Sequence, residues 1–247
     1  MLADKYDSVR QQILSACQSG QRAPESVQLL AVSKTRGADE IRQLHACGQT
    51  AFGENYLQEA LDKIAALQDL PLEWHFIGPI QSNKTRAIAE QFDWVHSVDR
   101  LKIARRLSEQ RPDELPPLNL CLQVNISDEA SKSGCTPEEL PELARAVAAL
   151  PRLRLRGLMA IPEAETDPAR QRATFARVRT LMEALQAELP QLDTLSMGMS
   201  GDLEAAIAEG STLVRVGTAL FGPRNYNSAG TNSEANPGAD TSATTNV

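Results

Sequence analysis

A lysine stands directly after an apolar run near the start of the chain. Residues 28–33 read QLLAVS, and Lys34 follows at once. A lysine that closes a strand is often an ordinary surface charge. The alternative is a partly desolvated amine that attacks an aldehyde and forms a Schiff base with it. The position of Lys34 alone is compatible with both interpretations.

Two glycine-bearing turns near the other end of the chain are typical of an anion site. The segment LSMGMSGD (195–202) leads into a predicted helix, and VRVGT (214–218) ends a predicted strand. Backbone N–H groups and the positive end of a short helix commonly hold a phosphate in such turns. Ser200 either caps the helix or donates its hydroxyl to the phosphate. Gly217 allows close approach of a ligand to the backbone, and Thr218 adds an amide and a hydroxyl.

Arg215 lies between two valines in the run that precedes Gly217. Because an arginine is seldom buried without a partner, it predicts either a structural ion pair or a guanidinium that donates to a ligand. A Schiff-base lysine opposite a phosphate site predicts a ligand that carries both an aldehyde and a phosphate. Pyridoxal 5'-phosphate (PLP) fits this description.

Short apolar runs alternate with stretches of helical period, a pattern typical of βα units around a parallel sheet. The predicted strands are 28–33, 50–53, 73–77, 93–97, 118–126, 153–159, 192–196 and 213–217. The predicted helices are 4–18, 38–47, 56–67, 83–90, 99–109, 137–149, 168–188 and 201–209. Thr136 followed by Pro137, and Asp167 followed by Pro168, are predicted helix starts.

Eight strand-helix repeats predict an α/β fold, the (β/α)8 TIM barrel, in which the ends of the strands form the working face. The helix at 4–18 would cover the barrel where a helix after the last strand is missing. An open doubly wound sheet is the alternative, but it needs reversals of strand order that the sequence does not indicate. The barrel would occupy residues 1–226, and the polar segment 227–247 predicts a disordered low-complexity tail.

The composition argues against several classes of function. The chain has 25 Lys and Arg against 32 Asp and Glu, a formal charge of -7, which disfavours binding to nucleic acid. The first residues lack a basic start followed by an apolar core, so we expect no secretory leader, and no apolar stretch reaches the roughly 18 residues that a membrane helix needs. Its four cysteines and three histidines lack the spacing of a metal site. We expect a cytoplasmic protein with free thiols, no metal and no contact with membranes.

The chain resembles the pyridoxal phosphate homeostasis protein family, single-domain relatives of the alanine racemase N-terminal barrel without its C-terminal β domain. The resemblance covers residues 1–226 and rests on AVSKT, FGENY, WHFIGPIQSNK, VNISDEASKSG, RGLMAIP, LSMGMSGD and VRVGTALFG. It implies PLP as the cofactor. The residues that it places at the cofactor are Lys34 (covalent aldimine), Asn55, Met199, Ser200, Arg215, Gly217 and Thr218.

The resemblance also implies how these residues divide the work. Ser200, Gly217 and Thr218 hold the phosphate, with a backbone contact from Met199. Arg215 faces the pyridine nitrogen, where a permanent cation disfavours protonation and weakens the ring as an electron sink. Asn55 either caps the second helix or lies near the ring.

Two further residues are candidates for a secondary role. His75 in WHFIG is either a satisfied core histidine or part of the pocket wall. Lys132, in the loop 127–134, is either a solvated charge or a secondary contact for phosphate or released cofactor.

Whether the protein is an enzyme or a carrier depends on whether it has an acid and a base on the two faces of the ring. Related racemases add a β-rich domain that supplies an acid or base on the opposite face of the ring, and the predicted tail cannot form one. We therefore expect a monomeric, non-catalytic PLP carrier that contributes to vitamin B6 homeostasis and meets PLP-dependent apoenzymes transiently. The alternatives are a PLP-dependent amino-acid racemase or lyase, completed by a partner subunit, and a cofactor-free Schiff-base aldolase.

Overall fold

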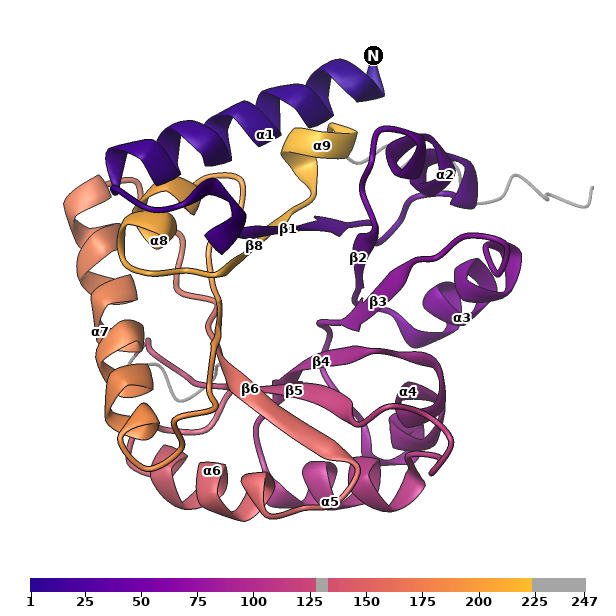
Figure 1. Ribbon diagram of the computed structural model, residues 1–247, viewed down its shortest axis with the longest axis vertical. Helices are drawn as coiled ribbons and strands as arrows, with labels where there is room; N and C mark the ends of the chain where they lie inside the picture. Colours follow the sequence, from indigo (N-terminus) through magenta and orange to yellow (C-terminus); the bar gives the residue numbers. More distant parts are fainter. Residues whose placement is uncertain (128–132, 224–247) are drawn as a thin grey trace, which may run out of the picture.

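The computed structural model describes residues 1–127 and 133–223, within which eight parallel strands close into a barrel in chain order (Figure 1). The first and last strands pair directly, with Leu30 opposite Arg215 and Ala31 opposite Val216. This closure confirms the predicted (β/α)8 barrel and excludes the open doubly wound sheet, which would leave two strand edges unpaired.

The elements follow the predicted order, with bounds that differ by a few residues. The strands are β1 Gln28–Val32, β2 Ala51–Glu54, β3 Glu73–Phe76, β4 Trp94–Val98, β5 Leu118–Gln123, β6 Leu153–Met159, β7 Thr194–Ser196 and β8 Leu213–Val216. The α-helices are α1 Leu2–Ser19, α2 Ala38–Ala46, α3 Leu57–Ala66, α4 Thr85–Gln91, α5 Leu101–Gln110, α6 Leu140–Ala148, α7 Pro168–Gln186, α8 Leu203–Ala208 and α9 Thr218–Phe221. Short 3-10 turns lie at Pro24–Ser26 and Ser82–Lys84.

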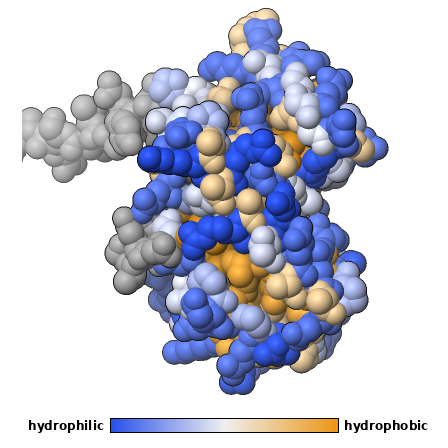
Figure 2. Space-filling model, turned by 90° about the vertical axis from the view of Figure 1, so that its left-hand side faces the viewer, coloured by the Kyte–Doolittle hydropathy of each residue, from blue (hydrophilic) through white to orange (hydrophobic). Residues whose placement is uncertain are grey.

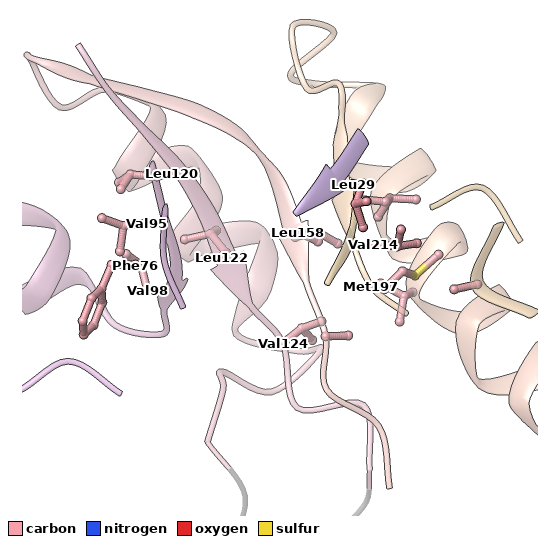
Figure 3. Packing of buried hydrophobic residues seen from close by; sticks show 14 of the residues in the cluster. Leu29, Phe76, Val95, Val98, Leu120, Leu122, Val124, Leu158, Met197 and Val214 are labelled. Atoms are coloured by element: carbon pink, nitrogen blue, oxygen red, sulfur yellow. The ribbon is translucent and has the colours of Figure 1, made fainter. Parts of the chain in front are cut away.

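The main apolar core lies between the barrel and its ring of helices. Because successive side chains of a strand point to opposite faces, every second residue meets this layer. Figure 3 shows Leu120 and Leu122 of β5 and Val214 of β8 within it, all fully buried. Burying each such side chain stabilises the fold by about 1.5–3 kcal/mol.

The inward-pointing residues divide the interior of the barrel into two small apolar groups and a polar row. One group joins β8, β1, β2 and β3 through Leu213, Leu30, Val32, Ala51 and Ile77. The other joins β4, β5 and β6 through Trp94, Cys121 and Met159. The polar row consists of His75, His96, Ser196 and Arg215, all buried.

Helix α1 crosses the outside of the barrel where β8 meets β1, alongside α8, α9 and α2 (Figure 1). The side chain of Arg22, just after α1, donates to the carbonyl oxygens of Ile207 and Ser211 at 2.8 and 2.7 Å. These bonds tie the end of α1 to the α8 region. The first helix covers this side of the barrel as predicted, but a short helix, α9, follows the last strand, where none was expected.

The two predicted helix starts have different outcomes. Asp167 caps α7, because its carboxylate accepts a hydrogen bond from the Ala169 amide at 2.9 Å. The capping contacts predicted at Thr136 are present, but the regular helix α6 begins later than predicted, at Leu140. Thr136 Oγ1 accepts from the Glu139 amide, and the Glu139 carboxylate accepts from the Thr136 amide, so the capping contacts close a separate turn.

Polar side chains cover most of the face in Figure 2, and apolar side chains gather in a smaller area near its middle. No helix within the described ranges combines the length and apolarity needed to cross a membrane. The predicted tail at 227–247 and Lys132 lie outside the described residues.

Candidate functional site

A cavity of about 270 Å³ opens where the C-terminal ends of several strands meet the loops that follow them. All seven residues expected at a cofactor line it, although they come from positions 34 to 218 of the chain. The full lining is Val32, Lys34, Asn55, Ile77, Ile161, Met199, Ser200, Gly201, Arg215, Gly217 and Thr218.

The backbone on both sides of Lys34 is fixed by charged side chains, the buried Lys63 and the partly buried Glu59. Lys63 Nζ donates to the carbonyl oxygen of Ser33 at 2.7 Å. On the other side, the Thr35 amide donates to Glu59 Oε1 at 2.5 Å. Thr35 has a φ of 64°, which is a strained conformation for a β-branched residue. The contacts therefore hold Lys34 at the end of β1 against a local backbone cost.

These contacts belong to a charged cluster of the buried Glu54 and Lys63 and the partly buried Glu59. Lys63 Nζ lies 2.8 Å from Glu54 Oε1 and 2.5 Å from Glu59 Oε1. Ser33 Oγ also donates to Glu54 Oε1, at 2.5 Å. Burial raises the pKa of Glu54, and the neighbouring Lys63 ammonium opposes this effect. Sequence reasoning missed the cluster; its available signal was a glutamate at the end of β2 with Glu59 and Lys63 one turn apart on α3.

The turns after β7 and β8 form a cradle suited to an anion. Helix α8 begins at Leu203 with Asp202 as its N-cap, so the predicted capping role of Ser200 was wrong. A Cβ added to Gly201 would meet nothing within 4 Å, which leaves open space beside Ser200. Thr218 begins α9, where the first N–H groups have no acceptor inside the helix. Ser200 and Gly201 from one turn, and Gly217 and Thr218 from the other, line the same cavity.

Met199 lines the rim of the cavity with a side chain that is 38% exposed. Its amide donates to Asp202 Oδ1 at 2.6 Å. A backbone contact from Met199 to an anion would require this bond to open.

Arg215 is buried and points from β8 into the cavity. Its Nη1 donates to Ser196 O at 2.7 Å and to Ser196 Oγ at 2.8 Å, and its Nη2 donates to Ala160 O at 2.9 Å. Neutral oxygen atoms accept all three bonds, so an ion pair does not account for the buried guanidinium. Burial lowers the pKa of Arg215 to about 10, which still leaves it a cation at neutral pH.

Asn55 and His75 have different positions. Tyr56 is the N-cap of α3, so the predicted capping role of Asn55 was wrong. Asn55 Oδ1 is buried at the cavity and has no hydrogen-bond partner within the described part of the chain. His75 is fully buried inside the barrel and does not line the cavity. Its two ring nitrogens lie within hydrogen-bond distance of His96 and Glu73.

These features fit a ligand with an aldehyde and a phosphate. The buried Asn55 Oδ1 has no hydrogen-bond partner among the described residues and can accept one from a ligand. The open space beside Gly201 has room for an anion next to Ser200. Lys34 directly follows β1, the strand that pairs with β8, and it lines the same cavity as Arg215. The arrangement can hold such a ligand at both ends.

A closed parallel barrel with a lysine after β1 and glycine turns after β7 and β8 defines the alanine racemase N-terminal domain class, and the description of that family matches residues 12–225. A protein of Pseudomonas aeruginosa named pyridoxal phosphate homeostasis protein is 66% identical over 225 residues, which are 91% of this chain and 96% of the relative. The chain belongs to the pyridoxal phosphate homeostasis protein family.

Two solved structures have folds similar to that of this chain. PipY of Synechococcus elongatus, solved with PLP bound, is 43% identical with a TM-score of 0.80 and covers 90% of this chain and 100% of its own. An alanine racemase of Clostridium difficile is 15% identical with a TM-score of 0.65, covering 88% of this chain and 57% of its own. The second likeness concerns the fold alone.

Proposed function

We propose that this protein binds PLP in the cavity and serves PLP homeostasis without turning over amino acids. The observation that carries the proposal is the set of side chains that line the cavity. Among its described residues it offers an amine, an anion cradle and a guanidinium, but no carboxylate, histidine, tyrosine or cysteine. The site can therefore hold the cofactor, whereas a second proton-transfer group for racemisation is missing from its wall.

Each residue has a role that its position supports. PLP supplies an aldehyde that condenses reversibly with an amine and releases water. Lys34 Nζ provides that amine, while the Ser200 and Thr218 hydroxyls and the Gly217 turn bind the phosphate. Arg215 donates toward the ring nitrogen as a cation, which keeps that nitrogen unprotonated and weakens stabilisation of a carbanion.

Reversible covalent binding suits a protein that stores a reactive aldehyde and releases it to apoenzymes. The names of the relatives, and the PLP bound in PipY, support this role. We also propose that the protein works as a monomer in the cytoplasm, where a reducing environment suits the unpaired cysteines seen in the structure.

The proposal is tested by adding PLP to the wild type, to Lys34→Ala and to Lys102→Ala, which alters a lysine outside the cavity. We expect a visible absorption band and about 1:1 covalent binding in the wild type and Lys102→Ala, and neither in Lys34→Ala. The loaded protein is then incubated with amino acids in D2O. Exchange of the α-proton faster than with free PLP would contradict the carrier role and favour a racemase.

A further inference from the structure

A continuous row of hydrogen bonds links Arg215 to the opposite, N-terminal end of the barrel. From Arg215 Nη1 it passes to Ser196 Oγ at 2.8 Å, and from Ser196 Oγ to His96 Nδ1 at 2.7 Å. His96 Nε2 lies 2.9 Å from His75 Nδ1. The row ends where His75 Nε2 lies 2.7 Å from the carboxylate of Glu73. Its members come from β8, β7, β4 and β3, so it crosses the interior from one side to the other.

The two ends of the row, with one proton on each imidazole, determine the direction of every hydrogen bond. The Arg215 guanidinium can only donate, and the ionised Glu73 carboxylate can only accept. Ser196 Oγ therefore accepts from Arg215 and gives its single hydrogen to His96 Nδ1. His96 in turn donates from Nε2 to His75, and His75 donates from Nε2 to Glu73. Both imidazoles are neutral in this arrangement, and all four bonds point away from Arg215.

The surroundings support the same protonation states. His75 and His96 are fully buried, and the ring of Trp94 stacks on His75 with 5.3 Å between centroids. Burial, together with His75 and Arg215, lowers the pKa of His96 well below its usual value. The hydrogen bond from His75 lowers the pKa of Glu73, which favours the ionised carboxylate. The aligned dipoles thus run from a buried cation to a partly exposed anion.

We propose that Ser196 and His96 are positioning residues that hold the Arg215 guanidinium toward the cofactor ring, with His75 and Glu73 fixing their hydrogen-bond directions. The proposal rests on the proposed function, in which Arg215 faces the ring nitrogen. The reason is geometric. Ser196 Oγ accepts from Arg215 and directs its own hydrogen to His96, and His96 can take that hydrogen only while its Nδ1 is unprotonated. Without the hydrogen bond to Ser196 Oγ, the Arg215 guanidinium would be held only by the carbonyl oxygens of Ser196 and Ala160 and would be oriented less firmly toward the ring.

The test uses PLP labelled with 15N at the ring nitrogen, whose NMR resonance distinguishes a protonated from an unprotonated nitrogen. It is recorded over a pH series for the wild type, Arg215→Met, Ser196→Ala, Ser196→Thr and His96→Leu. We expect Ser196→Ala and His96→Leu to shift protonation of the ring to higher pH, in the direction of Arg215→Met but by less. PLP affinity should fall about three- to tenfold in these two variants, as for loss of one typical hydrogen bond. Ser196→Thr, which keeps the hydroxyl, should restore the wild-type titration.

The outcomes separate the two proposals. If Arg215→Met changes the resonance but Ser196→Ala and His96→Leu do not, the positioning role is overturned and the PLP site stands. If Arg215→Met itself resembles the wild type, the assignment of Arg215 to the ring nitrogen fails, and the positioning role fails with it. Glu73→Leu, which removes the acceptor at the end of the row, serves if an interior variant does not fold, because Glu73 is partly exposed. It should shift the titration in the same direction, and a wild-type titration would count against the row.

Discussion

Replacement of Lys63 by methionine tests the claim that the charged cluster of Glu54, Lys63 and Glu59 fixes the end of β1. The change removes the ammonium that touches Glu54 and Glu59 and leaves the fully buried Glu54 carboxylate without its partner. Removing one member of a buried pair typically costs about 3–5 kcal/mol. That is a large part of the roughly 5–15 kcal/mol by which a domain is stable.

The loss should depend on pH, because Glu54 can escape its unpaired charge by taking up a proton. Burial already raises the pKa of Glu54, and Lys63 opposes that rise. Without Lys63 the pKa of the folded state moves higher above the unfolded value, so the folded form binds the additional proton. Stability is then retained at low pH and lost as the pH rises through the folded pKa, at about 1.4 kcal/mol per pH unit.

The assay is urea unfolding of the wild type, Lys63→Met and Glu54→Gln/Lys63→Met at about pH 5 and pH 8, analysed by linear extrapolation. The single variant should lose more stability at the higher pH. The double variant removes the stranded charge and keeps an acceptor for Ser33 Oγ, so it should recover most of the loss. A deficit of Lys63→Met that is equal at both pH values, or below about 1 kcal/mol, would refute the reasoning.

Three further predictions concern single positions. Among the four thiols, that of Cys47 should react first with a thiol reagent in the native protein, since the others are buried and burial raises the pKa of two of them to about 12; equally fast labelling of two or more thiols would contradict this. Gly78→Ala should lower stability by about 1–3 kcal/mol and weaken PLP binding, because the new Cβ would lie 2.1 Å from the backbone oxygen of Asn55; thermal unfolding and PLP titration measure both effects, and an unchanged titration would separate Gly78 from the site. Asp167→Ala should cost about 1 kcal/mol in urea unfolding by removing the cap on the Ala169 amide, and should leave PLP binding unchanged.

Much of the fold and of the cavity could be predicted from the sequence because the signals are local or carried by motif. Apolar runs that alternate with helical stretches indicate a barrel, and a barrel brings the ends of its strands to one face. Lys34 and the Gly217 turn follow such runs directly, so their meeting at one cavity follows from topology. The N-cap of α7 could be predicted for the same reason, since Asp167 and Pro168 are adjacent in the sequence.

The errors and omissions concern contacts that depend on register and side-chain direction. Ser200 precedes the predicted helix by one residue, but the chain makes one more turn before Asp202 takes the cap. His75 and His96 are 21 residues apart, and only the pairing of β3 with β4 brings their rings together. The burial of Lys63 on α3 contradicts the usual preference of lysine for solvent, so no local pattern indicated it.

The most direct test of the central claim is reduction of the PLP-loaded protein with borohydride, followed by peptide mapping. The reagent fixes the covalent linkage between the cofactor and whichever amine has bound it. The site described here predicts one labelled peptide, with the label on Lys34. Label spread over surface lysines, or no label after loading, would contradict the assignment of the cavity to PLP.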